Sequence, residues 1–222
     1  DSCDKQIHQR PFGVTPGTHN AVAEIVNRHA WDDDETNDEQ WPYRVKFSGT
    51  DLLGNVTIPE GDPTDVETSL EVSLDASSES YPLHTFNLLN DGVMEKIAKA
   101  FKLQPSEIAS ATLETGVVKA EGFTGPADGK VAVGLTNPDG SVSYAYSANG
   151  IGFWIAEDGS AGVWGDGTKI YFEYDAGGYA LTVGHKPGAS EKGKTYTIKP
   201  TMVYNKNGKL HKAVITIKMK FA

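Results

Sequence analysis

The chain has 222 residues, of which 38% are hydrophobic and 23% are charged, with 24 glycines and 11 prolines. This composition is typical of a globular, turn-rich protein and excludes a disordered or fibrous chain. A formal net charge of −10 argues against a nucleic-acid-binding protein, because neutralising phosphates requires a basic surface. The sequence also lacks a run of about 18 apolar residues, which is the length that a membrane-spanning helix needs.

The only cysteine, Cys3, lies in the segment DSCDKQ. A single cysteine forms no internal disulfide and supplies no cysteine-rich metal site. Two roles are open for it. It could be a free thiol in a terminal segment, or it could be the lipid-attachment residue of a bacterial lipoprotein, with the polar segment DKQIHQR after it as a tether.

Residues 1–65 are expected to form an N-terminal tether and an irregular segment with one short helix. The helix is expected within AVAEIVNRHAW, residues 21–31, where Val22, Ile25 and Val26 have helical spacing. YRVKFSG, residues 43–49, alternates like a strand. IPEGDPTD, residues 58–65, contains two prolines and a glycine and is the expected boundary.

The acidic run DDDETNDEQ, residues 32–40, follows the expected helix. It could bind calcium through Asp32, Asp34 and Asp38. However, it lacks the glycine and the terminal glutamate of an EF-hand loop, which favours a solvated acidic loop.

From residue 66 onward the sequence predicts a mainly β domain, residues 66–222, with a two-helix insertion near residues 91–113. ETSLEVSLDA, residues 67–76, alternates apolar and polar residues. Four hairpins are expected after the helices, with turns at NPDG, EDGS, AGG and NKNG. The last strand, in KLHKAVITIKMKF, should have one buried and one solvated face. Short strands at this spacing predict an antiparallel β-sandwich, either jelly-roll or immunoglobulin-like.

The helical insertion, MEKIAKAFKLQPSEIASATL, has the pattern of a DNA-reading helix-turn-helix. An apolar stripe runs along residues 94–101, Asn90 or Asp91 could cap the first helix, and Pro105 suits the first turn of the second. The second helix begins with Pro-Ser-Glu, whereas base reading requires donors at these positions. We therefore expect the helix pair to cap the β core and not to bind DNA.

The segment GFWIAEDGSAGVWGDGTKIYFEYDAGGY, residues 152–179, combines aromatic and acidic side chains. Flat aromatic rings stack on the C–H faces of sugars, and carboxylates bind sugar hydroxyls, so this segment is a candidate glycan-binding surface. The alternative is that the aromatic residues are ordinary strand and core residues. The candidate ligand-binding residues are Trp154, Trp164, Tyr171, Tyr174, Tyr179, Asp166 and Glu173.

The second hairpin turn decides how the two tryptophans are related. A two-residue turn at Asp158 and Gly159 would place Trp154 and Trp164 on opposite faces of the sheet, whereas a three-residue turn would pair them directly. Exposed tryptophan rings would favour glycan binding, and fully buried rings would favour a scaffold.

A catalytic role is the third alternative. Glu173 with Asp166 or Asp175 could form the acid/base pair of a glycoside hydrolase, which needs two carboxyls roughly 5 to 10 Å apart in a cleft. Turn aspartates are common for backbone reasons, so a non-catalytic protein is favoured and no catalytic residue is assigned. The six histidines show no metal-ligand spacing, and neither a metal nor a cofactor is expected.

Three segments, in order, resemble a known family: KIAKAFKLQPSEI, then GFWIAEDGSAGVWGDGTKIYFEY, then LTVGHKPGASEKGKTYTIKPTMVY. They are similar to an uncharacterised β-rich domain family of Bacteroidetes cell-envelope lipoproteins, which is also found appended to glycan-degrading enzymes. The family's GQYPG-like turn is GHKPG here, so His185 and Lys186 depart from the pattern. The resemblance covers about residues 66–222. It implies lipid attachment at Cys3 and a role in carbohydrate capture, and it transfers no catalytic residue.

Together, these patterns favour a non-catalytic glycan-binding lipoprotein of the cell envelope, on the surface or periplasmic face of the outer membrane. Its expected partner is a polysaccharide or oligosaccharide, with membrane contact only through the lipid anchor and no nucleic acid. The alternatives are an envelope scaffold or protein-interaction module, with envelope proteins as partners, and a glycoside hydrolase with an Asp/Glu pair.

Overall fold

The computed structural model describes residues 22–26, 44–48, 54–77, 80–113, 122–144, 150–165 and 167–222. Three features predicted from the sequence lie outside these residues: the lipid-attachment candidate Cys3, the acidic run at 32–40 and the site candidate Asp166.

The two earliest strands, β1 (Val22–Val26) and β2 (Arg44–Ser48), pair antiparallel with each other, and Val22 lies opposite Ser48. β2 confirms the strand expected at 43–49. The helix expected at 21–31 is wrong over its described part, because residues 22–26 form a strand. β-Branched residues favour a strand where a partner strand is available, and this preference outweighs their helical spacing.

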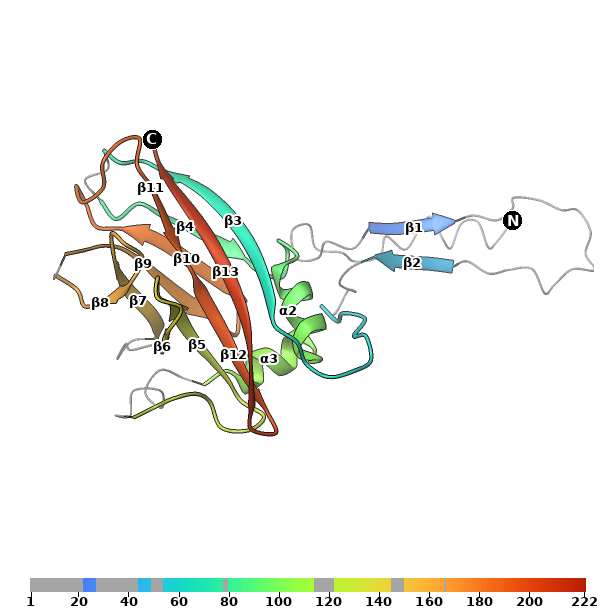
Figure 1. The fold of residues 1–222 in the computed structure, drawn as a ribbon. Coiled ribbons are helices and arrows are strands. Elements are labelled where there is room, and N and C mark those ends of the chain that lie inside the picture. Colours follow the sequence, from blue (N-terminus) through green and yellow to red (C-terminus); the bar gives the residue numbers. More distant parts are fainter. Residues whose placement is uncertain are drawn as a thin grey trace, which may run out of the picture.

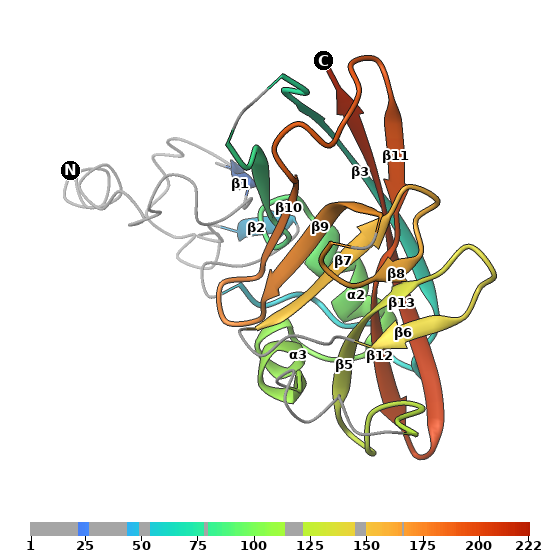
Figure 2. The same cartoon turned by 90° about the vertical axis from the view of Figure 1, so that its left-hand side faces the viewer.

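The remaining strands form a two-sheet β-sandwich, as the sequence predicts (Figure 1). The first sheet has five antiparallel strands. In spatial order these are β4 (Leu83–Asn87), β10 (Ala180–His185), β9 (Thr168–Asp175), β7 (Ile151–Ala156) and β8 (Ala161–Gly162). Figure 2 shows β10, β9, β7 and β8 side by side in front of helix α2.

The second sheet is built around the long strand β13 (Lys209–Phe221). Its other strands are β3 (Val66–Leu74), β5 (Val131–Thr136), β6 (Val142–Tyr144), β11 (Thr195–Ile198) and β12 (Pro200–Lys206). β11 and β12 pair antiparallel with β13, and β5 and β6 continue the sheet from β12. On its other edge β13 pairs with β3 in parallel, so this sheet is mixed and not purely antiparallel as expected.

The last hairpin follows the sequence pattern closely. Along β13, Ile215, Ile217 and Met219 are buried, whereas the alternate Lys218 and Lys220 are exposed. The β12–β13 turn has two residues, Asn207 and Gly208, with φ values of 53° and 80°. Positive φ at both positions is the geometry of a type I′ hairpin turn, which matches the right-handed strand twist.

The two helices predicted at 91–113 are present as α2 (Val93–Phe101) and α3 (Pro105–Ala111). α3 begins at Pro105, as expected. The expected cap of α2 is wrong, because Gly92, with a φ of 71°, precedes the helix and no side chain caps it. None of the described helices has the length and hydropathy needed to span a membrane.

The helices pack onto the sandwich through the predicted apolar stripe. Met94, Ile97 and Phe101 are fully buried, and the Phe101 ring lies 5.5 Å from that of Tyr204 on β12. At the start of α3, Gln104 also binds the main chain of Val56, with hydrogen bonds of 2.9 Å to its N–H and its carbonyl. The helix pair therefore belongs to the core and anchors the segment that leads into β3.

Candidate functional site

Strand alternation places two predicted aromatic residues on the outer face of the five-stranded sheet. Phe153 on β7 and Phe172 on β9 lie opposite each other and are buried in the core. Their neighbours Trp154 and Tyr171, which are also opposite each other, therefore face outward. The centroids of these two rings are 5.1 Å apart and their planes are inclined by 52°. Such a cross-strand aromatic pair stabilises the sheet and presents a continuous aromatic surface.

A groove of about 1040 Å³ lies over this aromatic pair. Its aromatic lining residues comprise the outward-facing Tyr81, Tyr144, Trp154, Trp164 and Tyr171 and the buried Phe153, Phe172 and Tyr174. Its polar lining residues include Ser143, Glu173, Asp175 and Thr182. Small-molecule sites typically measure roughly 300 to 1,000 Å³, so this groove is large. It combines apolar ring surface with hydroxyl and carboxylate groups.

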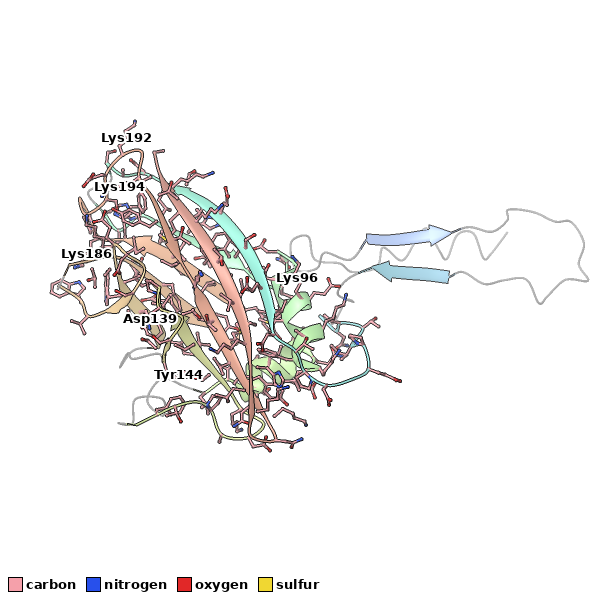
Figure 3. The ribbon with its side chains drawn as sticks, viewed as in Figure 1. Lys96, Asp139, Tyr144, Lys186, Lys192 and Lys194 are labelled. Atoms are coloured by element: carbon pink, nitrogen blue, oxygen red, sulfur yellow. The ribbon has the colours of Figure 1, made fainter. Side chains whose placement is uncertain are left out.

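Trp164 is the most exposed aromatic side chain of the groove, with 65% of its surface accessible, whereas Trp154 is half-buried. The ammonium nitrogen of Lys186 lies 5.1 Å from the Trp164 ring centroid and 5.4 Å from that of Trp154. Both distances are within the range of a cation–π interaction. Lys186, which Figure 3 labels, therefore links the two tryptophans.

The β7–β8 hairpin has a three-residue loop, but its register does not pair Trp154 with Trp164. Trp154 lies opposite Gly162, and the Ala156 N–H donates to the Ser160 carbonyl at 2.9 Å. The loop is thus Glu157-Asp158-Gly159, and Trp164 lies beyond the end of β8. Because Trp164 is not part of a strand, the two tryptophans are neither a cross-strand pair nor residues on opposite faces of the β7–β8 hairpin. Both indole rings nevertheless lie within contact distance of the Lys186 ammonium.

Glycines on the outer face give the groove side chains room to lie against the sheet. At Gly184, an added Cβ would be 2.6 Å from the hydroxyl oxygen of Tyr171, and at Gly152 it would be 3.3 Å from Cγ of Glu173. Both distances are below ordinary van der Waals contact. Tyr171 and Glu173 can therefore occupy their positions only because these two residues carry no side chain.

Tyr171 is only 9% exposed, but it contributes to the groove lining. Burial raises the pKa of its phenol above the ordinary value, and the charge of nearby Glu173 raises that pKa further. The phenol therefore stays protonated at neutral pH and keeps a hydrogen atom that it can donate.

Two of the predicted ligand-binding residues offer no accessible ring face for stacking in the groove. Tyr174 is 5% exposed and belongs to the hydrophobic core, since it lies opposite Ile151 and Leu181 on the inner face. Tyr179 lies in the β9–β10 turn with a φ of 52°, packs against the core and is not part of the groove lining. A sugar cannot stack on Tyr174, because the opposite sheet covers that side of the strand.

The two carboxylates on β9 lie on the same side of the sheet. Glu173 and Asp175 are separated by one residue, so their Cα atoms are about 7 Å apart. Asp175 accepts a hydrogen bond from the Gly177 N–H at 3.0 Å, which shapes the β9–β10 turn. Asp175 therefore has a structural role, and Glu173 is the carboxylate available to a ligand. Within the described ranges, no three His, Cys, Asp or Glu side chains are grouped as a metal site.

The sequence did not indicate Tyr81 and Tyr144, which line the groove, or Lys186, whose ammonium contacts two of its rings. Tyr81 precedes β4 and is distant from residues 152–179 along the chain, whereas Tyr144 ends β6 and lies only eight residues before Gly152. Lys186 had one signal, its departure from the GQYPG-like turn of the resembling family. That signal did not indicate that its ammonium would contact two indole rings.

The fold and the groove define this protein as a β-sandwich domain with an aromatic groove on one outer face. The chain belongs to the family described as Domain of unknown function (DUF4859), whose model matches residues 80–209. This match covers more than half of the chain and confirms the resemblance to an uncharacterised β-rich family. Neither the search of curated proteins nor the search of solved structures returned a match.

Proposed function

We propose that this protein is a non-catalytic glycan-binding module and that its ligand lies in the groove over β7 and β9. The observation that carries the proposal is the pair of accessible tryptophans, with Trp164 65% exposed at the mouth of the groove. Exposing an indole ring to water is unfavourable, and an exposed aromatic surface flanked by polar groups marks a binding site.

The groove supplies both kinds of contact that a sugar ring needs. The faces of Trp164 and Trp154 offer apolar surface for the C–H groups of the sugar. The carboxylate of Glu173 accepts hydrogen bonds from sugar hydroxyls, and the Tyr171 hydroxyl can donate one. The size of the groove suits an oligosaccharide segment better than a single sugar.

In this proposal the chain is a cell-envelope lipoprotein that captures a polysaccharide or oligosaccharide near the outer membrane. The lipid anchor would be at Cys3, and the Bacteroidetes envelope context follows from the family resemblance in the sequence. Labelling cells with radioactive palmitate tests the anchor, because the full-length protein should incorporate label and its Cys3→Ala variant should not.

Affinity gel electrophoresis against a panel of polysaccharides, with Trp164→Ala as the variant, tests glycan binding. A central aromatic contact typically contributes about 2 kcal/mol or more to binding, so the variant should bind about thirtyfold more weakly. Its free energy of unfolding should change by no more than about 0.5 kcal/mol, because the side chain is mainly exposed. Leu210→Ala is the matched control, since Leu210 is an exposed apolar residue outside the groove.

The same panel separates this function from its alternatives. Failure of every polysaccharide to retard the protein would contradict glycan binding and favour a scaffold or protein-interaction module. Release of reducing ends from a bound polysaccharide, abolished by Glu173→Gln, would instead indicate a glycoside hydrolase.

A further inference from the structure

Lys186 is held in place by its main chain, so its position beside the tryptophans is defined. Its N–H donates to the carbonyl of Lys169 on β9 at 3.0 Å. Its own carbonyl lies 2.6 Å from Nδ1 of the buried His185 and also accepts the N–H of Ala189 at 3.2 Å. The side chain thus starts from a fixed point at the edge of the groove and extends over Trp154 and Trp164.

The neighbouring lysines at this end of the sheet are neutralised, whereas Lys186 is not neutralised by any described carboxylate. Lys169 and Lys194 both form ion pairs with Glu157, the first at 3.0 Å. Hydrogen bonds from Lys194 and Lys169 hold the pKa of Glu157 below its ordinary value, so this carboxylate is charged at neutral pH. Among the described residues, the contacts of the Lys186 ammonium are the two indole rings.

A cation–π contact at an exposed site is weaker than a charge-assisted hydrogen bond to an anionic oxygen. A ligand that brings a carboxylate or sulfate to Lys186 therefore gains a stronger interaction than the one it replaces. The faces of Trp154 and Trp164 then become available for the ring that carries this anionic group.

The charges along the groove differ from one end to the other. The main chain of Lys186 is hydrogen-bonded to that of Lys169. Glu173 lies four residues after Lys169 along β9, so the Cα atoms of Lys169 and Glu173 are about 13 Å apart. Asp175 follows on the same side of the strand and also lines the groove. A densely charged polyanion would meet repulsion from these two carboxylates, whereas the hydroxyl groups of a neutral sugar would find an acceptor in Glu173.

We propose that the groove binds a largely neutral glycan that carries a single anionic sugar residue, whose carboxylate or sulfate pairs with Lys186 while its ring stacks on Trp164. This inference rests on the proposed glycan-binding function and specifies its ligand class. Lys186 then selects the acidic sugar, and Glu173 disfavours a second negative charge farther along the bound glycan.

The test measures binding of the full chain to glucuronoxylan, carboxyl-reduced glucuronoxylan, polygalacturonate, largely desulfated κ-carrageenan and neutral mannan by affinity gel electrophoresis. We expect retardation by glucuronoxylan, which carries isolated carboxylates, or by largely desulfated κ-carrageenan, which carries isolated sulfates, and this separates a carboxylate ligand from a sulfate ligand. Carboxyl reduction of glucuronoxylan or the Lys186→Gln variant should weaken its binding by about tenfold or more, the loss expected for one charge-assisted hydrogen bond. Lys192→Gln is the control, because Lys192 is exposed and carries the same charge, whereas the ammonium that lies against the two tryptophan rings belongs to Lys186. Figure 3 labels both lysines.

Each contrary outcome refers to a different part of the proposal. Binding only to neutral mannan, or binding that Trp164→Ala abolishes and Lys186→Gln leaves unchanged, would preserve glycan binding and overturn the role of Lys186. Polygalacturonate as the tightest ligand would overturn the selection for isolated charge. Failure of all five polysaccharides to bind would overturn this inference, and if the wider panel also failed, glycan binding itself would be contradicted.

Discussion

Replacing Gly184 by alanine should destabilise the protein, because Tyr171 occupies the space that a side chain would need. The added Cβ would lie 2.6 Å from the Tyr171 hydroxyl oxygen, 2.7 Å from its Cζ atom and 2.7 Å from the carbonyl oxygen of Pro82. The Pro82 carbonyl accepts the N–H of His185 at 3.2 Å and cannot move without breaking this bond. The Tyr171 ring is packed against Trp154 and has little room to withdraw.

Overpacking of this kind typically costs about 1 to 3 kcal/mol in the free energy of unfolding. For a protein of this size, that cost corresponds to a melting temperature lower by roughly 2 to 12 °C. Thermal and urea unfolding of Gly184→Ala measure it directly. Because Tyr171 must shift, the variant should also weaken the proposed binding of glycan in the groove.

Gly177→Ala is the matched control, since it makes the same chemical change in the hairpin of the same sheet. Its Cβ would meet only Oδ1 of Asp175 at 3.5 Å, which is an ordinary contact. At a compatible site, exchanging glycine for alanine is neutral or stabilises by about 0.4 to 1 kcal/mol. If Gly184→Ala and Gly177→Ala unfold at the same temperature, the close approach of Tyr171 to the sheet is refuted.

Two further predictions concern buried and turn hydrogen bonds. His185 is fully buried, and its ring nitrogens lie 2.6 Å and 3.2 Å from two main-chain carbonyl oxygens. His185→Leu should lower the free energy of unfolding, measured by urea titration, by about 1 to 3 kcal/mol. His185→Gln should lose less, because glutamine keeps a hydrogen-bond donor. Equal stability of the wild type and the leucine variant would contradict this prediction. Three turn aspartates accept hydrogen bonds from both the side-chain O–H and the main-chain N–H of the serine two residues later: Asp75, Asp139 and Asp158. These hydrogen bonds lower the pKa of each carboxyl below its ordinary value. The three ionised carboxylates therefore stabilise the folded state fully at pH values above the unfolded-state pKa of about 3.9. This contribution is lost as the pH falls through the lower pKa of the folded state. A variant with all three aspartates replaced by asparagine should have a lower free energy of unfolding than the wild type at pH 7, and the difference should shrink below about pH 4. If the difference stayed the same at all pH values, the ionised aspartates would not stabilise the folded state.

Much of the fold could be predicted because its signals are local. The alternation along β13 and the Asn207-Gly208 turn depend only on neighbouring residues, and both have the expected geometry. Pro105 likewise marks the start of α3. The strand at 22–26 was predicted as a helix because Val22, Ile25 and Val26 have helical spacing, and the sequence did not reveal its pairing with the strand at 44–48.

The groove was predictable only in part. Trp154 and Trp164 belong to one segment, and their residue types alone indicated a candidate sugar-binding surface. Tyr174 was assigned to the same surface, although alternation places it on the inner face of β9. Alternation along β9 separates Tyr171 and Glu173 from Tyr174, but the sequence did not show which of the two faces points into the core.

The sequence by itself determined the elements of this protein: strands that alternate apolar and polar residues, turns that require glycine or asparagine, and an amphipathic helix pair. These follow from backbone sterics and from hydrophobic burial within a few residues. Only the tertiary structure decided that β3 joins β13 in parallel and that Tyr171 lies against Gly184. It also decided that Lys186 lies over two tryptophans from a different hairpin. Such contacts join residues far apart along the chain, and no local periodicity specifies which strands become neighbours.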